Sequence, residues 1–191
     1  MLFTWFKDSL KIPRHKYTKR EKTVVKILKK NFKGINSCLN VGFHDWDDER
    51  KHWWINICKK NNIKWKILEI FQPNIKNAID AGCPKENIFL GNILDISTYG
   101  NFDCIMFWHG PEHIEKDLFL EKLSQIEKKA NKLIIFGMPH GEEIQEAVYG
   151  NKYEEHISAW YEDDWHRLGY KTMIVNDRIP GHITAFKCIE N

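Results

Sequence analysis

The chain has 191 residues, of which 42% are hydrophobic and 13% aromatic, and a net charge of +3. These values describe one packed globular domain and exclude an intrinsically disordered chain. No stretch reaches the roughly 20 apolar residues of a membrane helix, and the apolar N-terminal run stops at Lys7 and Asp8, too early for a secretory signal. The five cysteines are odd in number and form no CxxC pair, which indicates reduced thiols, a cytoplasmic setting and no zinc–cysteine site.

The charge is concentrated near the N-terminus. Residues 11–33 contain ten basic side chains and one acid, Glu21, so this segment carries +9 and the rest of the chain −6. A basic arm on an acidic body attracts phosphate or another polyanion, but the same pattern is also that of an ordinary solvated helix face. Val24, Ile27, Leu28 and Phe32 recur at helical spacing and predict a core-facing stripe. We therefore expect residues 1–34 to form a basic helical segment packed on residues 35–191, within a single domain overall.

Short apolar runs typical of strands alternate with helical stretches along the rest of the chain. Strands are predicted at 37–43, 65–71, 87–93, 102–109 and 132–139, and helices at 47–61, 73–82, 115–132 and 161–168. Two last strands, at 170–177 and 181–189, predict an antiparallel hairpin. The pattern favours an α/β fold: a doubly wound, mostly parallel seven-stranded sheet with a C-terminal antiparallel hairpin and helices on both faces.

Four loops are expected at the ligand crevice, which in such sheets lies beyond the carboxyl ends of the strands, near the switch in strand order. In the first, Gly42 permits close approach of a ligand to the backbone. At the second, the Glu69 carboxylate can accept both hydroxyls of a ribose, although a lone acid is more often a surface residue. The third loop, Gly91-Asn92-Ile93, offers polar and apolar side chains for the edge and face of an adenine. The fourth loop, Phe107-Trp108-His109, ends the fourth strand.

The order of these motifs resembles that of class I S-adenosylmethionine-dependent methyltransferases, from about Ser37 to the C-terminus. CLNVG, ILEIFQPNIKNAI, LGNILD, FDCIMFWHGPEHI, KLIIFGMPHG and HISAWYEDDWHRLGYKTMIV follow one another as the family's successive motifs do. The resemblance implies a Rossmann-like fold and S-adenosylmethionine held by Asn40, Gly42, His44, Glu69, Ile70, Asn92, Ile93 and Trp108.

The chain departs from the family pattern in two places. The first loop is glycine-poor after Gly42, and Asn40 and Asn92 stand where acids are commoner. The glycine-poor loop also argues against NAD, since a dinucleotide needs GxGxxG at this turn to admit its pyrophosphate.

A group of histidines with one acid supplies the candidate catalytic residues. His109, Glu112 and His113 form an HxxEH group whose spacing brings them together if Pro111 opens a helix. With His156, this set resembles the metal site of small-RNA 3′-terminal 2′-O-methyltransferases and quinone-pathway O-methyltransferases, with His109 replacing the first Glu of their ExxEH motif. The resemblance implies a divalent ion near the acceptor hydroxyl, and three imidazoles with one carboxylate favour a borderline transition ion. The alternatives are His109 as a general base without metal, and a Glu–His pair that caps a helix and lines the pocket.

The leading interpretation is a methyltransferase acting on an oxygen or nitrogen of a small or sugar-like metabolite, because so short a chain leaves little room for a recognition domain. One alternative is a nucleic-acid (RNA) methyltransferase that uses the basic segment against phosphates. A non-catalytic relative that binds a cofactor or partner is the other, suggested by the glycine-poor first loop.

Overall fold

A computed structural model describes residues 10–43, 52–148 and 150–189. Its centre is a seven-stranded sheet in the order β3-β2-β1-β4-β5-β7-β6. The strands are β1 (Ser37–Val41), β2 (Lys64–Glu69), β3 (Ile88–Leu90), β4 (Phe102–Trp108), β5 (Ala130–His140), β6 (Lys171–Val175) and β7 (Gly181–Cys188). The first five strands are parallel, and β7 is antiparallel to both β5 and β6. The predicted mixed sheet with a C-terminal hairpin is confirmed.

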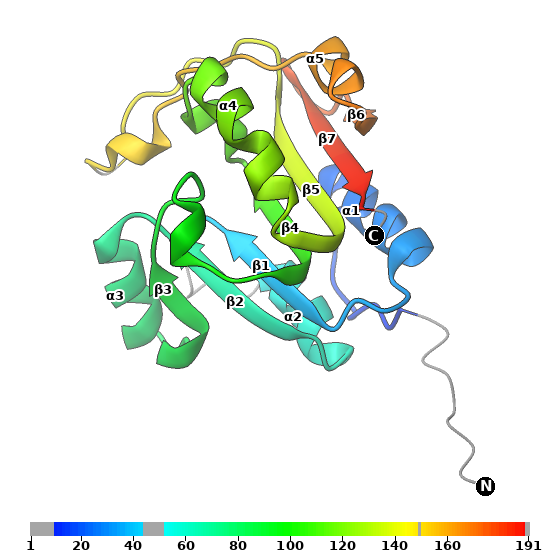
Figure 1. The fold of residues 1–191 in the computed structure, drawn as a ribbon, viewed down its shortest axis with the longest axis vertical. Helices are drawn as coiled ribbons and strands as arrows, with labels where there is room; N and C mark the ends of the chain where they lie inside the picture. Colours follow the sequence, from blue (N-terminus) through cyan, green and yellow to red (C-terminus); the bar gives the residue numbers. More distant parts are fainter. Residues whose placement is uncertain (1–9, 44–51, 149, 190–191) are drawn as a thin grey trace, which may run out of the picture.

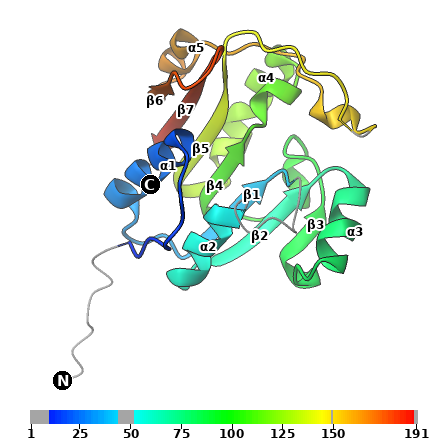
Figure 2. The same cartoon turned by 180° about the vertical axis from the view of Figure 1, so that it is seen from behind.

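Helices cover both faces of the sheet (Figures 1 and 2). The helices are α1 (Lys19–Asn31), α2 (Trp53–Lys60), α3 (Gln72–Asp80), α4 (Lys116–Glu127) and α5 (Glu162–Arg167). One apolar core joins the sheet to side chains of α1, α2 and α3, and a second core joins it to α4 and α5. Because the central strands are buried on both sides, their sequences are nearly continuous apolar runs.

Several predicted boundaries are wrong by a few residues. The helix predicted to 132 ends at Glu127, and β5 already begins at Ala130. The strand predicted at 87–93 stops at Leu90, because a turn follows in which the Asn92 side chain accepts from the Leu94 amide. The described part of the helix predicted at 47–61 is α2, and residues 44–51 lie outside the described ranges.

Helix α1 packs on the hairpin end of the sheet. Its first turn is closed by a capping box between Thr18 and Glu21. Val24, Ile27 and Leu28 are buried, as the apolar stripe predicts. The Thr23 and Thr184 hydroxyls lie 2.7 Å apart and tie the helix to β7. Within the described ranges, no helix is long and apolar enough to cross a membrane.

Candidate functional site

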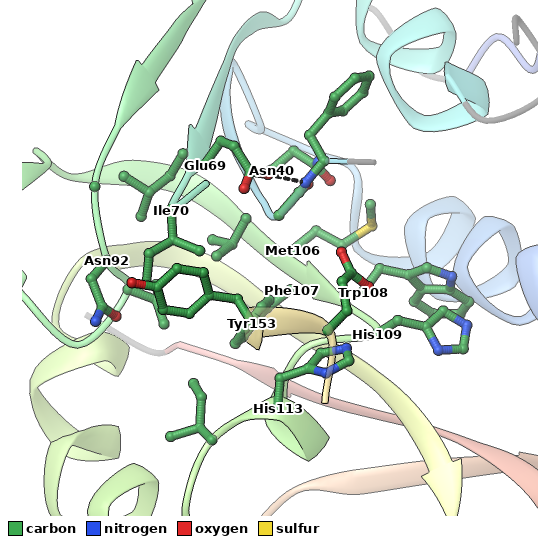
Figure 3. Close-up of a pocket in the computed structure, with 18 of the residues that line it drawn as sticks. Asn40, Glu69, Ile70, Asn92, Met106, Phe107, Trp108, His109, His113 and Tyr153 are labelled. Carbon is green, nitrogen blue, oxygen red and sulfur yellow. Dashed lines mark hydrogen bonds between the residues drawn. The ribbon is translucent and has the colours of Figure 1, made fainter. Parts of the chain in front are cut away.

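A cavity of about 880 Å³ lies at the carboxyl ends of β1, β2 and β4 (Figure 3). This is where the strand order changes direction, β2 lying on one side of β1 and β4 on the other. Seven of the eight residues predicted to hold a cofactor line it: Asn40, Gly42, Glu69, Ile70, Asn92, Ile93 and Trp108. The eighth, His44, lies outside the described residues.

The turn after β1 is shaped by Gly42 and Asn40. Gly42 has a φ of +78°, and its amide donates to the Leu68 carbonyl at 2.9 Å. A Cβ built on Gly42 meets nothing within 4 Å, so there is room for a side chain at this position. Glycine is favoured here because of the left-handed backbone conformation. The Asn40 side-chain amide donates to the Gly42 carbonyl at 2.9 Å, which fixes the turn that faces the cavity.

Glu69 ends β2 with a side chain that is only 3% exposed. One carboxylate oxygen accepts from the Phe43 amide at 2.7 Å, and the other accepts from the Phe71 amide at 2.8 Å. Burial raises the pKa of Glu69 to about 7, against the opposing effect of these backbone donors. Each carboxylate oxygen has a further lone pair, so the clamped group can still accept hydroxyl protons from a ligand.

The third loop is closely packed beneath the cavity. A Cβ on Gly91 would lie 2.4 Å from Leu68 Cδ1, so a larger residue there would require the Leu68 side chain to move. The Asn92 oxygen accepts from the Leu94 amide at 2.9 Å. Ile93, whose carbonyl accepts from the Tyr99 hydroxyl at 2.8 Å, is buried against the same region. This loop therefore presents the Asn92 amide and an aliphatic side chain to the cavity.

The fourth loop sets Trp108 and His109 at the other end of the cavity. The Trp108 indole lies against Gly137, where a Cβ would come 2.3 Å from the indole Cε3 atom. His109 has a φ of +52°, a strained conformation for a histidine, and its amide donates to the Gly137 carbonyl at 2.7 Å. Gly137 of β5 thus leaves room for the Trp108 indole and holds the backbone of His109.

His182 supports these two rings from β7, a role the sequence does not indicate. Its ring centroid lies 4.7 Å from that of Trp108 and 5.0 Å from that of His109. The side chain is fully buried, and neither ring nitrogen has a hydrogen-bond partner among the described residues. Burial, followed by the charges of His109 and two arginines, lowers the pKa of His182 to about 2, so this imidazole stays neutral.

Three of the four predicted histidine-group residues converge. One donor atom each from Glu112, His113 and His156 lies within 4.8 Å of the other two, whereas His109 does not belong to the group. The Nδ1 atom of His109 is 3.3 Å from Glu112 Oε1, an ion-pair distance without hydrogen-bond geometry. Glu112 is 2% exposed, and neither carboxylate oxygen has a hydrogen-bond partner among the described residues.

Backbone carbonyls orient the two imidazoles of this group. His113 Nδ1 lies 3.0 Å from the Glu155 carbonyl, and His156 Nδ1 lies 2.7 Å from the Glu143 carbonyl. A carbonyl only accepts, so both Nδ1 atoms carry the proton, and the Nε2 lone pairs remain available. Histidines that bind metals in proteins are held by such bonds.

His156 reaches Glu112 because the segment after β5 folds back. The amides of Ile157 and Ser158 both donate to the Glu112 carbonyl, at 2.9 and 3.1 Å. Pro111 opens a 3-10 turn, Pro111–His113, in place of the predicted start of a longer helix, and α4 begins later at Lys116. Of the predicted catalytic residues, His109 and His113 line the main cavity, and the buried Glu112 is not among the residues that line it.

Sequence reasoning missed the 3-10 turn Lys152–Glu154 as part of this site. Its Tyr153 stands among the side chains that surround the cavity (Figure 3). The segment has no apolar periodicity that would have marked it.

No protein-family model matches the chain, and no curated protein matches it. Solved structures do resemble it. A S-adenosylmethionine-dependent methyltransferase from Clostridium acetobutylicum ATCC 824 matches with a TM-score of 0.62 and 12% identity, over 90% of this chain and 91% of that one. A SAM-dependent methyltransferase from Archaeoglobus fulgidus gives 0.58 and 15%, over 88% and 93%. The magnesium protoporphyrin IX methyltransferase from Synechocystis PCC 6803, with bound SAM, gives 0.58 and 10%, over 89% and 77%.

At these identities the likeness concerns the course of the backbone. The match covers 88–90% of the chain, and so most of its seven-stranded sheet. The chain therefore has the Rossmann-like fold of the S-adenosylmethionine-dependent methyltransferases.

Proposed function

We propose that the chain is a S-adenosylmethionine-dependent methyltransferase that methylates an oxygen or nitrogen of a small or sugar-like acceptor. The observation that carries this proposal is the buried Glu69 carboxylate, clamped at the carboxyl end of β2 beside an 880 Å³ cavity. The volume falls within the range of about 300–1,000 Å³ typical of small-molecule sites. A carboxylate at this strand end suits the two hydroxyls of a ribose.

When bound, S-adenosylmethionine supplies an electrophilic methyl group. The residues of the chain have to hold the acceptor in line with that group and take up its proton. His109 suits the second task, because it lines the cavity and its ring lies beside those of Trp108 and His182. Trp108 and Tyr153 line the same space.

The experiment that tests this proposal is calorimetry with S-adenosylhomocysteine. We expect the wild-type chain to bind it and Glu69→Gln to weaken binding by about 1–3 kcal/mol, the range for a lost hydrogen bond to a charged group. Glu86→Gln, which neutralises an exposed acid outside the cavity, is the matched control and should leave the affinity unchanged. Absence of binding by the wild-type chain would reject the proposal, and equal affinities would remove Glu69 from the cofactor site.

We further propose that Glu112, His113 and His156 hold a divalent transition ion in the cavity wall. A buried carboxylate without a hydrogen-bond partner is costly, and a cation would offset that cost. Two imidazoles with free Nε2 lone pairs complete a nitrogen and oxygen donor set that suits Mn²⁺, Co²⁺ or Zn²⁺. Such an ion lowers the pKa of a nearby hydroxyl and fixes its direction.

A titration of chelator-treated protein with Co²⁺ tests the ion separately from turnover. We expect one ion per chain, a cobalt absorption band in the visible range, and loss of both in Glu112→Gln. His166→Gln, which alters an exposed histidine outside the group, should bind as the wild type does. If the wild-type chain binds no Co²⁺, Mn²⁺ or Zn²⁺, His109 is left as a general base acting without metal.

A further inference from the structure

The exposed side of α1 is a continuous line of positive charge. We use the term basic face for the exposed lysines of α1 and of the residues just after it, which are Lys19, Lys22, Lys26, Lys29, Lys30 and Lys33. Their spacing of three and four residues places them on one side of the helix. Among the described residues, none of them forms an ion pair, so their charge is uncompensated.

The basic face is also long. From Lys19 to Lys33 it extends about 20 Å at the 1.5 Å rise of an α-helix. Three further exposed cations, Lys11, Arg14 and Lys16, belong to the segment that leads into the helix. A single phosphate group would contact only one end of this array, whereas a polymer of phosphates can follow it.

The first turn of α1 reaches the cavity. Glu21, in the first turn of α1, lines the cavity. Arg20 in the same turn pairs with Asp177 at 3.0 Å, which anchors this end of α1 to the turn after β6. Tyr17, just before the helix, meets Trp53 edge-on at 6.3 Å between ring centroids, and Trp53 is itself part of the cavity wall. The end of α1 that carries Lys19 and Lys22 is therefore the end nearest to the cavity, although no lysine of the basic face lines the cavity itself.

We propose that the basic face binds the phosphates of a single-stranded nucleic acid and that one of its nucleotides enters the cavity as the methyl acceptor. The entry of a nucleotide into the cavity rests on the proposed function. It identifies the sugar-like acceptor of that function as one nucleotide of a polymer. A single strand fits better than a duplex, because a nucleotide has to leave its stack to enter a cavity, and unstacking is cheapest where no pairing holds it. Lysine contacts to phosphates carry no sequence information, so binding is expected to depend weakly on sequence.

The apolar surface of the molecule favours a nucleic acid over an anionic membrane. The apolar side of α1 is buried in the core, so α1 cannot insert it into a bilayer. None of the large exposed hydrophobic residues of the described chain lies between residues 10 and 34. Within residues 10–34 the basic face thus has charge but no apolar anchor, which suits a phosphate backbone in water.

The test compares two triple variants in binding a labelled 12-nucleotide single-stranded RNA by fluorescence anisotropy. Lys22→Ala, Lys26→Ala and Lys29→Ala together remove three charges from the basic face, and alanine preserves the helix. The matched control removes three exposed lysines elsewhere: Lys64→Ala, Lys85→Ala and Lys128→Ala. We expect wild-type binding that falls with added salt, at least a tenfold loss in the basic-face variant with a salt slope smaller by about 2, and no loss in the control.

Three outcomes would overturn the binding surface: no RNA binding by the wild-type chain at low salt, equal losses in the two variants, or binding to phosphatidylserine vesicles without binding to RNA. A DNA strand of the same sequence shows whether the sugar is read or only the phosphates. Both variants should bind S-adenosylhomocysteine as the wild type does, since the substituted lysines lie outside the cavity. If the wild-type chain binds S-adenosylhomocysteine but not RNA, only this proposal is rejected and the proposed function stands. If it binds RNA but transfers no labelled methyl group to it, the nucleotide is rejected as the acceptor.

Discussion

Burial of Glu69 couples one residue of the candidate site to the stability of the whole fold. Its pKa in the folded chain is about 7, above the ordinary value of 4.5, so between these two pH values the folded state binds more protons than the unfolded state. The stabilisation from this group is complete below pH 4.5 and is lost as the pH rises through 7. Urea unfolding at pH 5 and pH 8 should show a larger fall in unfolding free energy for the wild type than for Glu69→Gln, by up to about 3 kcal/mol. Parallel pH profiles for the two proteins would contradict the raised pKa.

Gly137 controls the position of Trp108 by having no side chain. In Gly137→Ala the new Cβ would overlap the indole, so the ring has to move, and overpacking of this kind costs about 1–3 kcal/mol. Gly100→Ala is the control, because a Cβ there meets nothing within 4 Å. We expect only Gly137→Ala to lower the urea midpoint and to weaken S-adenosylhomocysteine binding. Equal behaviour of the two variants would show that the ring adapts without cost.

At the scale of elements, the strands were the most predictable part of the chain. The run KLIIF is recognisable because both faces of β5 are buried, and Glu69 could be placed because it ends such a run. The end of α4 was misplaced because Lys128 and Lys129 are good helix formers, and local propensity does not show where a strand must begin. The course of the segment after β5 depends on the amides of Ile157 and Ser158, which donate to the distant Glu112 carbonyl, and a contact of that kind has no local signature in the sequence.

The start of α1 depends on the Thr18 hydroxyl, which accepts from the Glu21 amide at 3.2 Å. Thr18→Ala removes this acceptor from the first turn and should lower the free energy of unfolding by about 1 kcal/mol. Thr18→Ser keeps a hydroxyl at the same place and should stay close to the wild type. Urea denaturation of the three proteins is the measurement. A Ser variant as unstable as the Ala variant would assign the effect to the lost methyl group.

For the whole molecule, ligand binding should appear as added stability. S-adenosylhomocysteine at 100 times its dissociation constant stabilises the folded chain by about 2.7 kcal/mol, which raises the Tm by roughly 5–10 °C for a chain of this size. NAD should leave the Tm unchanged, because the turn after β1 lacks the glycines that admit a pyrophosphate. A thermal-shift series with S-adenosylmethionine, S-adenosylhomocysteine and NAD makes this comparison. A shift with NAD alone would reverse the assignment of the cavity.

The pairing of α1 with β7 has a consequence for synthesis on the ribosome. Thr23 and Thr184, which join the two elements, are 161 residues apart in the chain. At about 5–20 residues per second, α1 emerges roughly 8–32 s before the strand that it packs on. During that interval its apolar side has no native partner on β7, and its many lysines keep the nascent segment charged and resistant to aggregation. This side of the domain can therefore reach its final packing only after β7 has left the ribosome, whereas β1 and β2 can pair much earlier.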